Sequence, residues 1–478
     1  MFTLYNTKRV AILFLFLSFA GTVASQFIQK AIGAESFEKG SAIKLLPDGG
    51  YIIAGETESF GLTERDMLLT RTDSLGNLLW SKTFGGPERE TVNDVMPMPD
   101  GGFLLTSEKY QPNKQEGENL TLIKTDANGN IQWKKIYDEG GNETEGFAMH
   151  ATPDKAYIIA GMTKSMTMVS DAFFSMRSEN QFAYLLKVDS KGNKLWSKKF
   201  EYGGANVSST ATSVAIAADG SYLVAGNIGK KGKTDKKIEK PAQQVNMEEI
   251  RTALLLKVKP NGQLLWSREI EANKITMGFS VIETKNGGIV LAGNTNVSSN
   301  NMDVFITTFD NKGNLLWSKT YGAAKFESVA DVVETPDGGL VVSAMTYSFG
   351  NNISDVLLFK TDASGNLQWA KTYGGHNEEY PSKLILANNK LVTVGSTASN
   401  GSESFDVLLM STGLNGTGLC WGNEVKLATA NFQPVVTSIA TAKMEIVEQG
   451  ILPPNMKKPD AANIVEQRRI FKNKELCK

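Results

Sequence analysis

Four glutamates recur at matching places in the sequence and could hold a ligand together. Each precedes an Asp or Asn in a turn by ten residues, and they are Glu38, Glu90, Glu327 and Glu379. Carboxylates that converge on one axis can bind a cation or a polyhydroxylated ligand. In the alternative, each carboxylate caps backbone N–H groups of its own loop, which is what repetition favours. His376 stands three residues before Glu379 and is the imidazole expected beside these carboxylates.

Two long insertions are further candidates for ligand contact. Residues 162–181 contain the apolar stretch MTMVSDAFF with the adjacent Phe173 and Phe174. Exposed paired aromatics are unusual unless they pack down or meet a partner, so we predict these two rings as ligand contacts. Residues 227–249 carry six lysines, a run more typical of a solvated loop than of a site for a polyanion.

The sequence lacks catalytic and metal-binding signatures. Its 478 residues hold two His and two Cys, too few for zinc or iron–sulfur clusters. No nucleophile-with-base spacing, HExxH, Walker or dinucleotide motif occurs. Asp126, Asn128 and Asn130 could supply oxygen ligands to calcium, yet the distal acidic ligand of an EF-hand is missing. We therefore predict no catalytic residue and no metal ligand; no cofactor is expected, and calcium is the open alternative.

Net charge excludes one class of partner. Lys plus Arg number 50 against 51 for Asp plus Glu, a formal charge of −1. This balance gives no global field for a polyanion, so nucleic acid is not an expected partner.

A phrase of the form DxxGNxxW recurs along the chain and defines a repeat. Its tryptophans are Trp80, Trp133, Trp196, Trp266, Trp317 and Trp369, and a degenerate seventh copy ends at Trp421. A Trp present in every unit is expected to wedge between units as an apolar filler, not to stack on a ligand. These residues are therefore predicted to be structural.

A second phrase alternates with the first and completes the repeat unit. It reads PDGGYIIAG from Pro47 to Gly55 and also occurs seven times. Both phrases begin with turn residues and continue into β-rich segments, so each unit of about 50 residues holds four strands. Such units pack radially because none can bury both faces alone. The sequence predicts an all-β fold, a seven-bladed β-propeller of four-stranded antiparallel blades, over residues 36–422.

The predicted topology separates two faces. With strands A to D in each blade, the tight DGG and DxxGN turns lie at one end, the smooth face. The B–C and D–A connections lie at the other end, and both long insertions are B–C connections. Because insertions show which face is free to change, ligands are expected at this variable-loop face.

The two ends of the chain lie outside the repeat. Residues 1–25 have a basic start, an apolar stretch of about 14 residues and small residues near Ala24, typical of a cleaved signal peptide and too short to span a bilayer. No membrane span is expected after cleavage, and the protein is predicted to be secreted or periplasmic. Residues 423–478 are expected to form an extended strap that pairs near the ring closure. Cys420 and Cys477 are a possible disulfide in an oxidising compartment.

The repeats resemble those of bacterial secreted propellers with tandem DGG and DxxGNxxW phrases, over about residues 36–422. The Trp-bearing phrase is also similar to that of quinoprotein dehydrogenases, which combine eight blades with a calcium-held pyrroloquinoline quinone. The resemblance implies the propeller fold and leaves the function open, since propellers host many functions.

The sequence therefore favours an exported, non-catalytic binding or scaffold module with a protein or glycan ligand at its variable-loop face. The alternative is an enzyme, either carbohydrate-active or quinoprotein-like, that uses the central channel.

Overall fold

The computed structural model describes residues 27–476, except 60–63, 87–88, 110–118, 140–142, 172–173, 203–206, 232–248, 299–300, 350–352, 400–403, 439–442, 447–464 and 469–471. The signal segment, four of the six lysines of the 227–249 insertion, Phe173 and Cys477 lie outside these ranges. In the described part of the chain, no helix has the length and apolarity needed to cross a bilayer.

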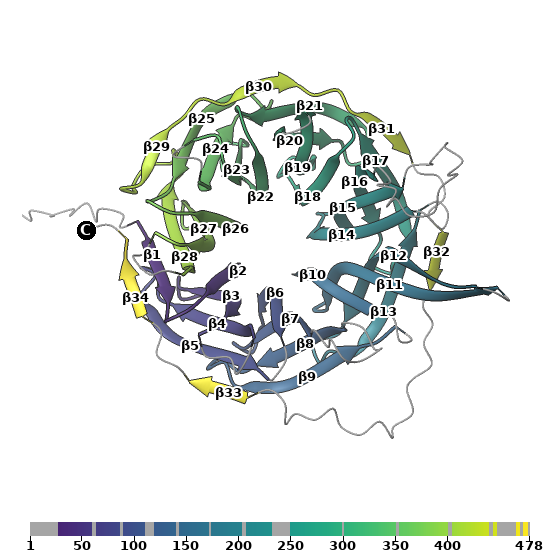
Figure 1. The fold of residues 1–478 in the computed structure, drawn as a ribbon, viewed down its shortest axis with the longest axis horizontal. Helices are drawn as coiled ribbons and strands as arrows, with labels where there is room; N and C mark the ends of the chain where they lie inside the picture. Colours follow the sequence, from purple (N-terminus) through teal and green to yellow (C-terminus); the bar gives the residue numbers. More distant parts are fainter. Residues whose placement is uncertain are drawn as a thin grey trace, which may run out of the picture.

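Seven antiparallel sheets surround a central axis and form the predicted seven-bladed β-propeller (Figure 1). From the inside outward, blade 1 contains β2 (Glu38–Leu45), β3 (Tyr51–Thr57), β4 (Asp66–Thr72) and β5 (Leu78–Gly85); blade 2 contains β6 (Glu90–Pro97), β7 (Phe103–Lys109), β8 (Leu120–Thr125) and β9 (Ile131–Tyr137); blade 3 contains β10 (Glu143–Ala151), β11 (Tyr157–Asp171), β12 (Phe174–Val188) and β13 (Lys194–Glu201).

The remaining blades follow the same order. Blade 4 contains β14 (Val207–Ile216), β15 (Tyr222–Lys231), β16 (Glu249–Val258) and β17 (Leu264–Glu271); blade 5 contains β18 (Thr276–Glu283), β19 (Ile289–Ser298), β20 (Asn301–Phe309) and β21 (Leu315–Gly322); blade 6 contains β22 (Glu327–Glu334), β23 (Leu340–Thr346), β24 (Asp355–Thr361) and β25 (Leu367–Tyr373); blade 7 contains β26 (Glu379–Ala387), β27 (Lys390–Thr397), β28 (Asp406–Gly413) and β1 (Gln29–Gly33).

The N-terminal strand β1 closes the ring. It pairs antiparallel with β28 as the fourth strand of blade 7, so both ends of the propeller share one sheet. The degenerate seventh repeat differs from expectation, because residues 414–421 form turns and bends instead of a Trp-bearing strand. The propeller therefore includes residues 29–33, which lie before the predicted boundary at residue 36.

The C-terminal residues form a belt around the ring. Its short strands each pair with the outer strand of one blade; they are β29 (Gly422–Glu424) on blade 6, β30 (Ala428–Asn431) on blade 5, β31 (Val435–Ser438) on blade 4, β32 (Lys443–Ile446) on blade 3, β33 (Val465–Arg468) on blade 1 and β34 (Lys472–Glu475) on blade 7. Figure 1 shows them along the rim of the disc. Within the described ranges, the predicted strap thus adds a fifth strand to six of the blades.

The repeat phrases have a packing explanation. Every inner strand has a register shift two to four residues after its start, as between Gly40 and Ala42 in β2. Such a bulge pushes the inner strand toward its neighbour. A Cβ on Gly55 of β3 would lie only 1.9 Å from the carbonyl oxygen of Lys39, so the phrase ends in glycine there. The bulge is thereby built into the inner edge of the blade.

The DxxGN turns tie neighbouring blades together. Asp126 Oδ1 accepts hydrogen bonds from the backbone N–H groups of Asn128 and Asn130, at 2.9 and 2.8 Å. The Asp126 carboxylate is therefore engaged by its own turn, and Asn130 Oδ1 accepts a hydrogen bond from Lys82 Nζ of the preceding blade. In the next such turn, Asn193 Oδ1 accepts a hydrogen bond from Lys135 Nζ of the preceding blade at 2.8 Å.

The repeated tryptophans lie between blades but are only partly buried. Trp133 covers Gly192 in the next turn, where a Cβ would lie 2.6 Å from the ring. The Trp196 indole N–H donates to the Pro260 carbonyl at 3.1 Å. These rings thus pack over the turn of the next blade, and the fully buried aromatics are others, such as Tyr321 and Phe359.

Candidate binding face

The four predicted glutamates lie at the starts of inner strands and point into their own blades. All four are buried, none more than 2 % exposed. Glu379 Oε1 accepts a hydrogen bond from Thr397 Oγ1 at 2.7 Å, and its Oε2 accepts one from the Gly375 N–H at 3.0 Å. Glu38 and Glu327 make the corresponding bonds to a threonine and a loop N–H. This geometry favours the capping role, and ligand binding by these carboxylates stays a prediction.

A second carboxylate lies beside three of the glutamates, on the preceding blade. The three pairs are Asp406 with Glu38, Asp303 with Glu327 and Asp355 with Glu379. A glycine makes room for each pair, since a Cβ on Gly374 would lie 1.8 Å from Asp355 Oδ1 and 2.9 Å from Glu379 Oε2. This close approach explains the recurring glycine after Phe or Tyr at the end of the outer strand.

Burial raises the pKa of Glu38, Asp303, Glu327, Asp355 and Glu379, so these carboxyl groups hold protons more tightly than carboxyl groups in water. Burial raises the pKa of Asp355 to about 6, and burial together with the nearby Glu327 raises the pKa of Asp303 to about 6. Burial also raises the pKa of Glu379, against the effect of its hydrogen bonds. An acid with such a pKa can serve in catalysis, but a pair present at three blade interfaces fits a structural element better than a single active site.

These pKa values predict a loss of stability as pH rises through 6. Because the folded pKa of about 6 exceeds the ordinary value of 3.8, the native state keeps a proton that the unfolded chain has released. The stabilisation is complete below pH 3.8 and is lost above pH 6. After discounting for partial solvent exposure, we expect a decrease of about 1 kcal/mol per carboxyl group between pH 5 and 7.

Denaturant titrations at pH 5 and pH 7 measure this loss. Asp303→Asn and Asp355→Asn should each reduce the decrease, because the amide has no proton to release. An unchanged pH dependence in both variants would contradict the assignment.

Five aromatic residues form an arc on the variable-loop face above these pairs. This aromatic arc consists of Phe326, Tyr347, Tyr380, Phe405 and Phe37, from blades 6, 7 and 1. Ring centroids are 6.4 Å apart between Phe326 and Tyr347, 5.6 Å between Tyr380 and Phe405, and 5.9 Å between Phe405 and Phe37. The hydroxyl oxygens of Tyr347 and Tyr380 lie 3.5 Å apart and link the two halves. All five side chains are partly exposed.

The positively charged side chain of Arg65 lies at the blade 1 end of the arc. The Arg65 guanidinium carbon lies 4.2 Å from the centroid of the Phe37 ring, and Arg65 Nε donates to Glu58 at 2.7 Å. This contact is a cation–π interaction. The arc thus offers rings, hydroxyl groups and one held cation on three consecutive blades.

Sequence reasoning missed the aromatic arc, although a signal existed. Three of its rings directly precede a repeated acidic residue, as in Phe37–Glu38, Phe326–Glu327 and Phe405–Asp406. The predicted His376 is exposed in the connection before Glu379 and is not part of the arc contacts. Phe174 begins β12 at the far end of the long β11–β12 hairpin, which Figure 1 shows projecting from the disc. Its side chain is not described.

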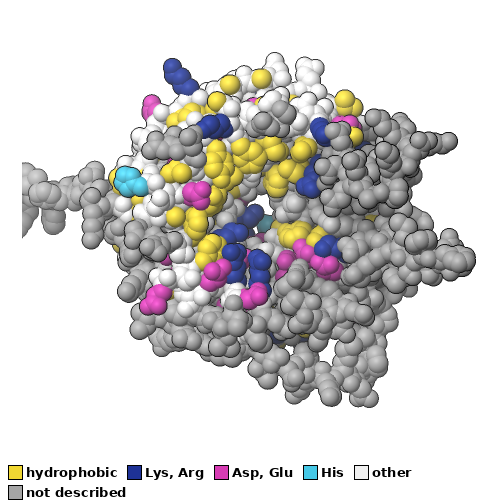
Figure 2. Space-filling view, viewed as in Figure 1, with side chains coloured by type: hydrophobic (Ala, Val, Ile, Leu, Met, Phe, Trp, Pro, Cys, Tyr) yellow, Lys and Arg dark blue, Asp and Glu magenta, His cyan; other side chains and the backbone are white. Residues whose placement is uncertain are grey.

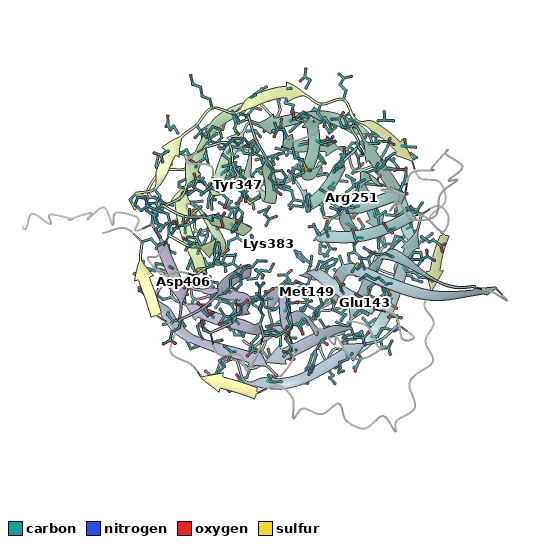
Figure 3. All side chains as sticks on the ribbon, viewed as in Figure 1. Glu143, Met149, Arg251, Tyr347, Lys383 and Asp406 are labelled. Atoms are coloured by element: carbon teal, nitrogen blue, oxygen red, sulfur yellow. The ribbon has the colours of Figure 1, made fainter. Side chains whose placement is uncertain are left out.

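The inner strands around the central channel carry two ion pairs, each between neighbouring blades. Lys44 Nζ lies 3.4 Å from Asp94 Oδ1, and Lys383 Nζ lies 4.0 Å from Asp331 Oδ2. Figure 3 places Lys383 at the central opening, and Figure 2 shows basic and acidic side chains gathered at the mouth of the channel. The nearby Asp331 and then Asp94 raise the pKa of Lys383, against the effect of burial. Each of these two lysines is thus paired with an aspartate of a neighbouring blade.

A cavity of about 250 Å³ lies at the end of the blades opposite to the aromatic arc. It opens between blades 5 and 6, and its walls include Asn286, Trp317, Glu334 and Leu340. These residues belong to or adjoin the DGG and DxxGN turns, so the cavity is on the smooth face. It is separate from the aromatic arc.

The fold and these sites define a seven-bladed, belted β-propeller of a repeat type similar to quinoproteins. Residues 65–371 match the family model described as outer membrane protein assembly factor BamB. Since this match covers more than half of the chain, the protein belongs to that family. No curated protein sequence matches the chain.

Solved structures share the general fold at low identity. They include a protein of unknown function from Dyadobacter fermentans (12% identity, TM-score 0.42, 69% of this chain and 94% of that one) and polysaccharide lyase Uly1 (11%, 0.47, 78% and 90%). An α-L-arabinanase from Penicillium chrysogenum is a third (11%, 0.44, 81% and 99%). Likenesses of this size say nothing about activity.

The residues do not fit a calcium-held quinone. Among the described residues, no group of three or more His, Cys, Asp or Glu could hold a metal ion. The sequence has no adjacent cysteine pair. The inner strands at the channel carry the ion pairs Lys44–Asp94 and Lys383–Asp331.

Proposed function

We propose that this protein is an exported binding or scaffold module that holds a protein partner on its variable-loop face without catalysis. The observation that supports this most is the aromatic arc. Partly exposed rings in mutual contact on adjacent blades are typical of the centres of protein interfaces, where Tyr, Phe and Arg are enriched. Export is supported by the predicted signal segment and by the family's description as an outer membrane assembly factor.

The carboxyl groups below the arc argue against the enzymatic alternative. A glycosidase needs one acid and one base or nucleophile that both face the substrate. Here the glutamates accept hydrogen bonds from their own blades, and the channel charges are paired. A glycan ligand remains the second candidate, because aromatic rings also stack on sugars.

A photo-crosslinker in place of Tyr347 tests the proposal in cells that export the full chain. We expect a covalent adduct with a specific protein, which mass spectrometry identifies. Leu316, 60 % exposed and next to Trp317 on the smooth face, is the matched control position and should give no such adduct. Adding Phe405→Ala should reduce the adduct at position 347 several-fold, because it removes the ring that joins two blades.

Two results would overturn the proposal. One is an equal yield of the same adduct from both positions. The other is no adduct at position 347 together with binding or cleavage of a polysaccharide by the purified protein, which would favour the glycan or enzyme alternative.

A further inference from the structure

An ion pair recurs at the smooth face in five of the first six blades. A basic residue two positions before the DxxGN phrase pairs with the Asp in the turn between the first two strands of the same blade. The pairs are Arg71–Asp48, Lys124–Asp100, Lys187–Asp154, Lys257–Asp219 and Lys360–Asp337. In blade 5 these two positions hold Thr308 and Asn286. Blade 5 therefore lacks both charges of the pair.

In blade 3 the lysine of this pair extends into the space between two blades. Lys187 Nζ lies 2.6 Å from Asp154 Oδ2 of its own blade. It also lies 3.4 Å from the carbonyl oxygen of Pro260 and 5.7 Å from the centroid of the Tyr222 ring, both on blade 4. The side chain of Lys187 thus occupies a slot between blades 3 and 4.

The cavity of about 250 Å³ is the corresponding slot between blades 5 and 6. Its walls include the residues at all four of these repeat positions, which are Thr308 for Lys187, Asn286 for Asp154, Leu340 for Tyr222 and Ala363 for Pro260. Because Thr308 and Leu340 are smaller than Lys187 and Tyr222, they leave open the volume that those two side chains fill. The cavity therefore lies where the repeat elsewhere holds a lysine side chain.

A carboxylate gives the cavity a negative charge. Glu334 lines it from blade 6, and Glu334 Oε2 accepts a hydrogen bond from the Lys285 N–H at 2.8 Å. The slot between blades 3 and 4 has Ile216 at the same repeat position. None of the described residues that line the cavity is basic. The nearby Lys319 donates a hydrogen bond to Asn366 Oδ1 at 2.8 Å instead.

We propose that this cavity binds a primary alkylammonium group on an apolar stem, as at the end of a lysine side chain. The stem contacts the apolar walls from Leu316, Trp317 and Leu340. An ammonium is a compact charge with three donors, so it suits single acceptors such as the Glu334 carboxylate and the Ala363 carbonyl. A guanidinium prefers a carboxylate with both oxygens available, and one oxygen of Glu334 is already engaged.

This site is on the smooth face and is independent of the aromatic arc. A protein captured through Leu316 that differs from the one captured through Tyr347 would be a ligand of the cavity and not of the arc.

Two matched peptides test the chemistry of the ligand. One is acetyl-Gly-Lys-Gly amide, and the other has norleucine in place of lysine, which keeps the stem and lacks the ammonium group. Ligand-detected NMR titrations with the full mature chain should show saturable binding of the lysine peptide, at least about fivefold tighter than that of the norleucine peptide. Butan-1-amine distinguishes the source of the group. Binding as tight as that of the peptide indicates a free amine and weaker binding indicates a polypeptide, and both results support the site.

A matched pair of variants tests the role of the carboxylate. Glu334→Gln should weaken binding of the lysine peptide at least about fivefold, because the amide keeps an acceptor for the backbone N–H and loses the charge. Glu283→Gln is the control. Glu283 accepts the same type of hydrogen bond from the Ala218 N–H of blade 4, where Lys257 is present in the slot. This variant should bind within about twofold of the wild type.

A second pair of variants tests the cavity itself. Thr308→Lys places the lysine of the repeat in the cavity and should abolish saturable binding, whereas Thr308→Val keeps the size of the side chain and should bind within about threefold of the wild type. Thermal melting checks the fold of every variant. Equal binding of the lysine and norleucine peptides, equal binding by Glu334→Gln and Glu283→Gln, or no saturable binding of either amine would overturn the inference.

Discussion

Replacing Asp94 with alanine is expected to lower the free energy of unfolding by about 2–3 kcal/mol, because a buried N–H loses its charged acceptor and a partly exposed lysine loses its partner. Asp94 is 3 % exposed and joins three blades. Its Oδ1 lies 3.4 Å from Lys44 Nζ of blade 1, and its Oδ2 accepts a hydrogen bond at 2.9 Å from the Met149 N–H of blade 3. Alanine would leave that buried N–H and the lysine without their partner.

Urea denaturation of the purified protein measures the change. Asp48→Ala is the control, because Asp48 is half exposed and pairs with Arg71 at the surface. A loss below about 1 kcal/mol is expected there. If both variants lost the same amount, the bridge between blades would not be the reason for the effect of Asp94→Ala.

The same bridge recurs on the other side of the ring. Asp331 of blade 6 accepts hydrogen bonds from Ser280 Oγ of blade 5 at 2.7 Å and from the Leu384 N–H of blade 7 at 3.3 Å. Both aspartates directly follow the bulged residue of an inner strand. The bulge therefore does more than accommodate the strand, because it aims one side chain at both neighbouring blades.

The ring could be predicted from the sequence because its signals are local and repeated. Each DGG and DxxGN phrase specifies a turn, and the spacing of the tryptophans gives the length of a blade. Ring closure could not be predicted from the degenerate seventh copy, since Trp421 is displaced by one position and β1 lies far away in the sequence. Closure depends on a sheet edge that exists only once the blades have assembled.

The belt and the site were harder to predict for the same reason. Strands such as Gly422–Glu424 and Ala428–Asn431 are three or four residues long and have no apolar alternation. They are extended because they pair with the outer strands of the blades, and no local sequence signal marks them. The carboxyl pairs did carry a signal. Asp303 and Asp355 each precede the partner glutamate by 24 residues. That spacing becomes a contact only when consecutive blades pack side by side.

Loss of the disulfide at Cys420 is expected to destabilise the whole ring. Cys420 is disulfide-bonded, and the sequence predicts Cys477, which lies outside the described residues, as its partner. Such a bond would join the start of the belt to its end, next to β34 and β1. For a closed loop of 57 residues, loss of the constraint on the unfolded chain corresponds to about 4 kcal/mol.

Equilibrium denaturation of Cys420→Ser, Cys477→Ser and the double variant tests both the bond and its partner. All three variants should lose the same free energy of unfolding, because either single change already opens the belt. Wild-type protein treated with a reductant should fall to the level of the variants, whereas the reductant should leave the double variant unchanged. Additive losses in the double variant would mean that the two cysteines act separately. A belt closed in this way would hold β34 against β1 and so prevent the seventh blade, where the two ends of the propeller meet, from opening first.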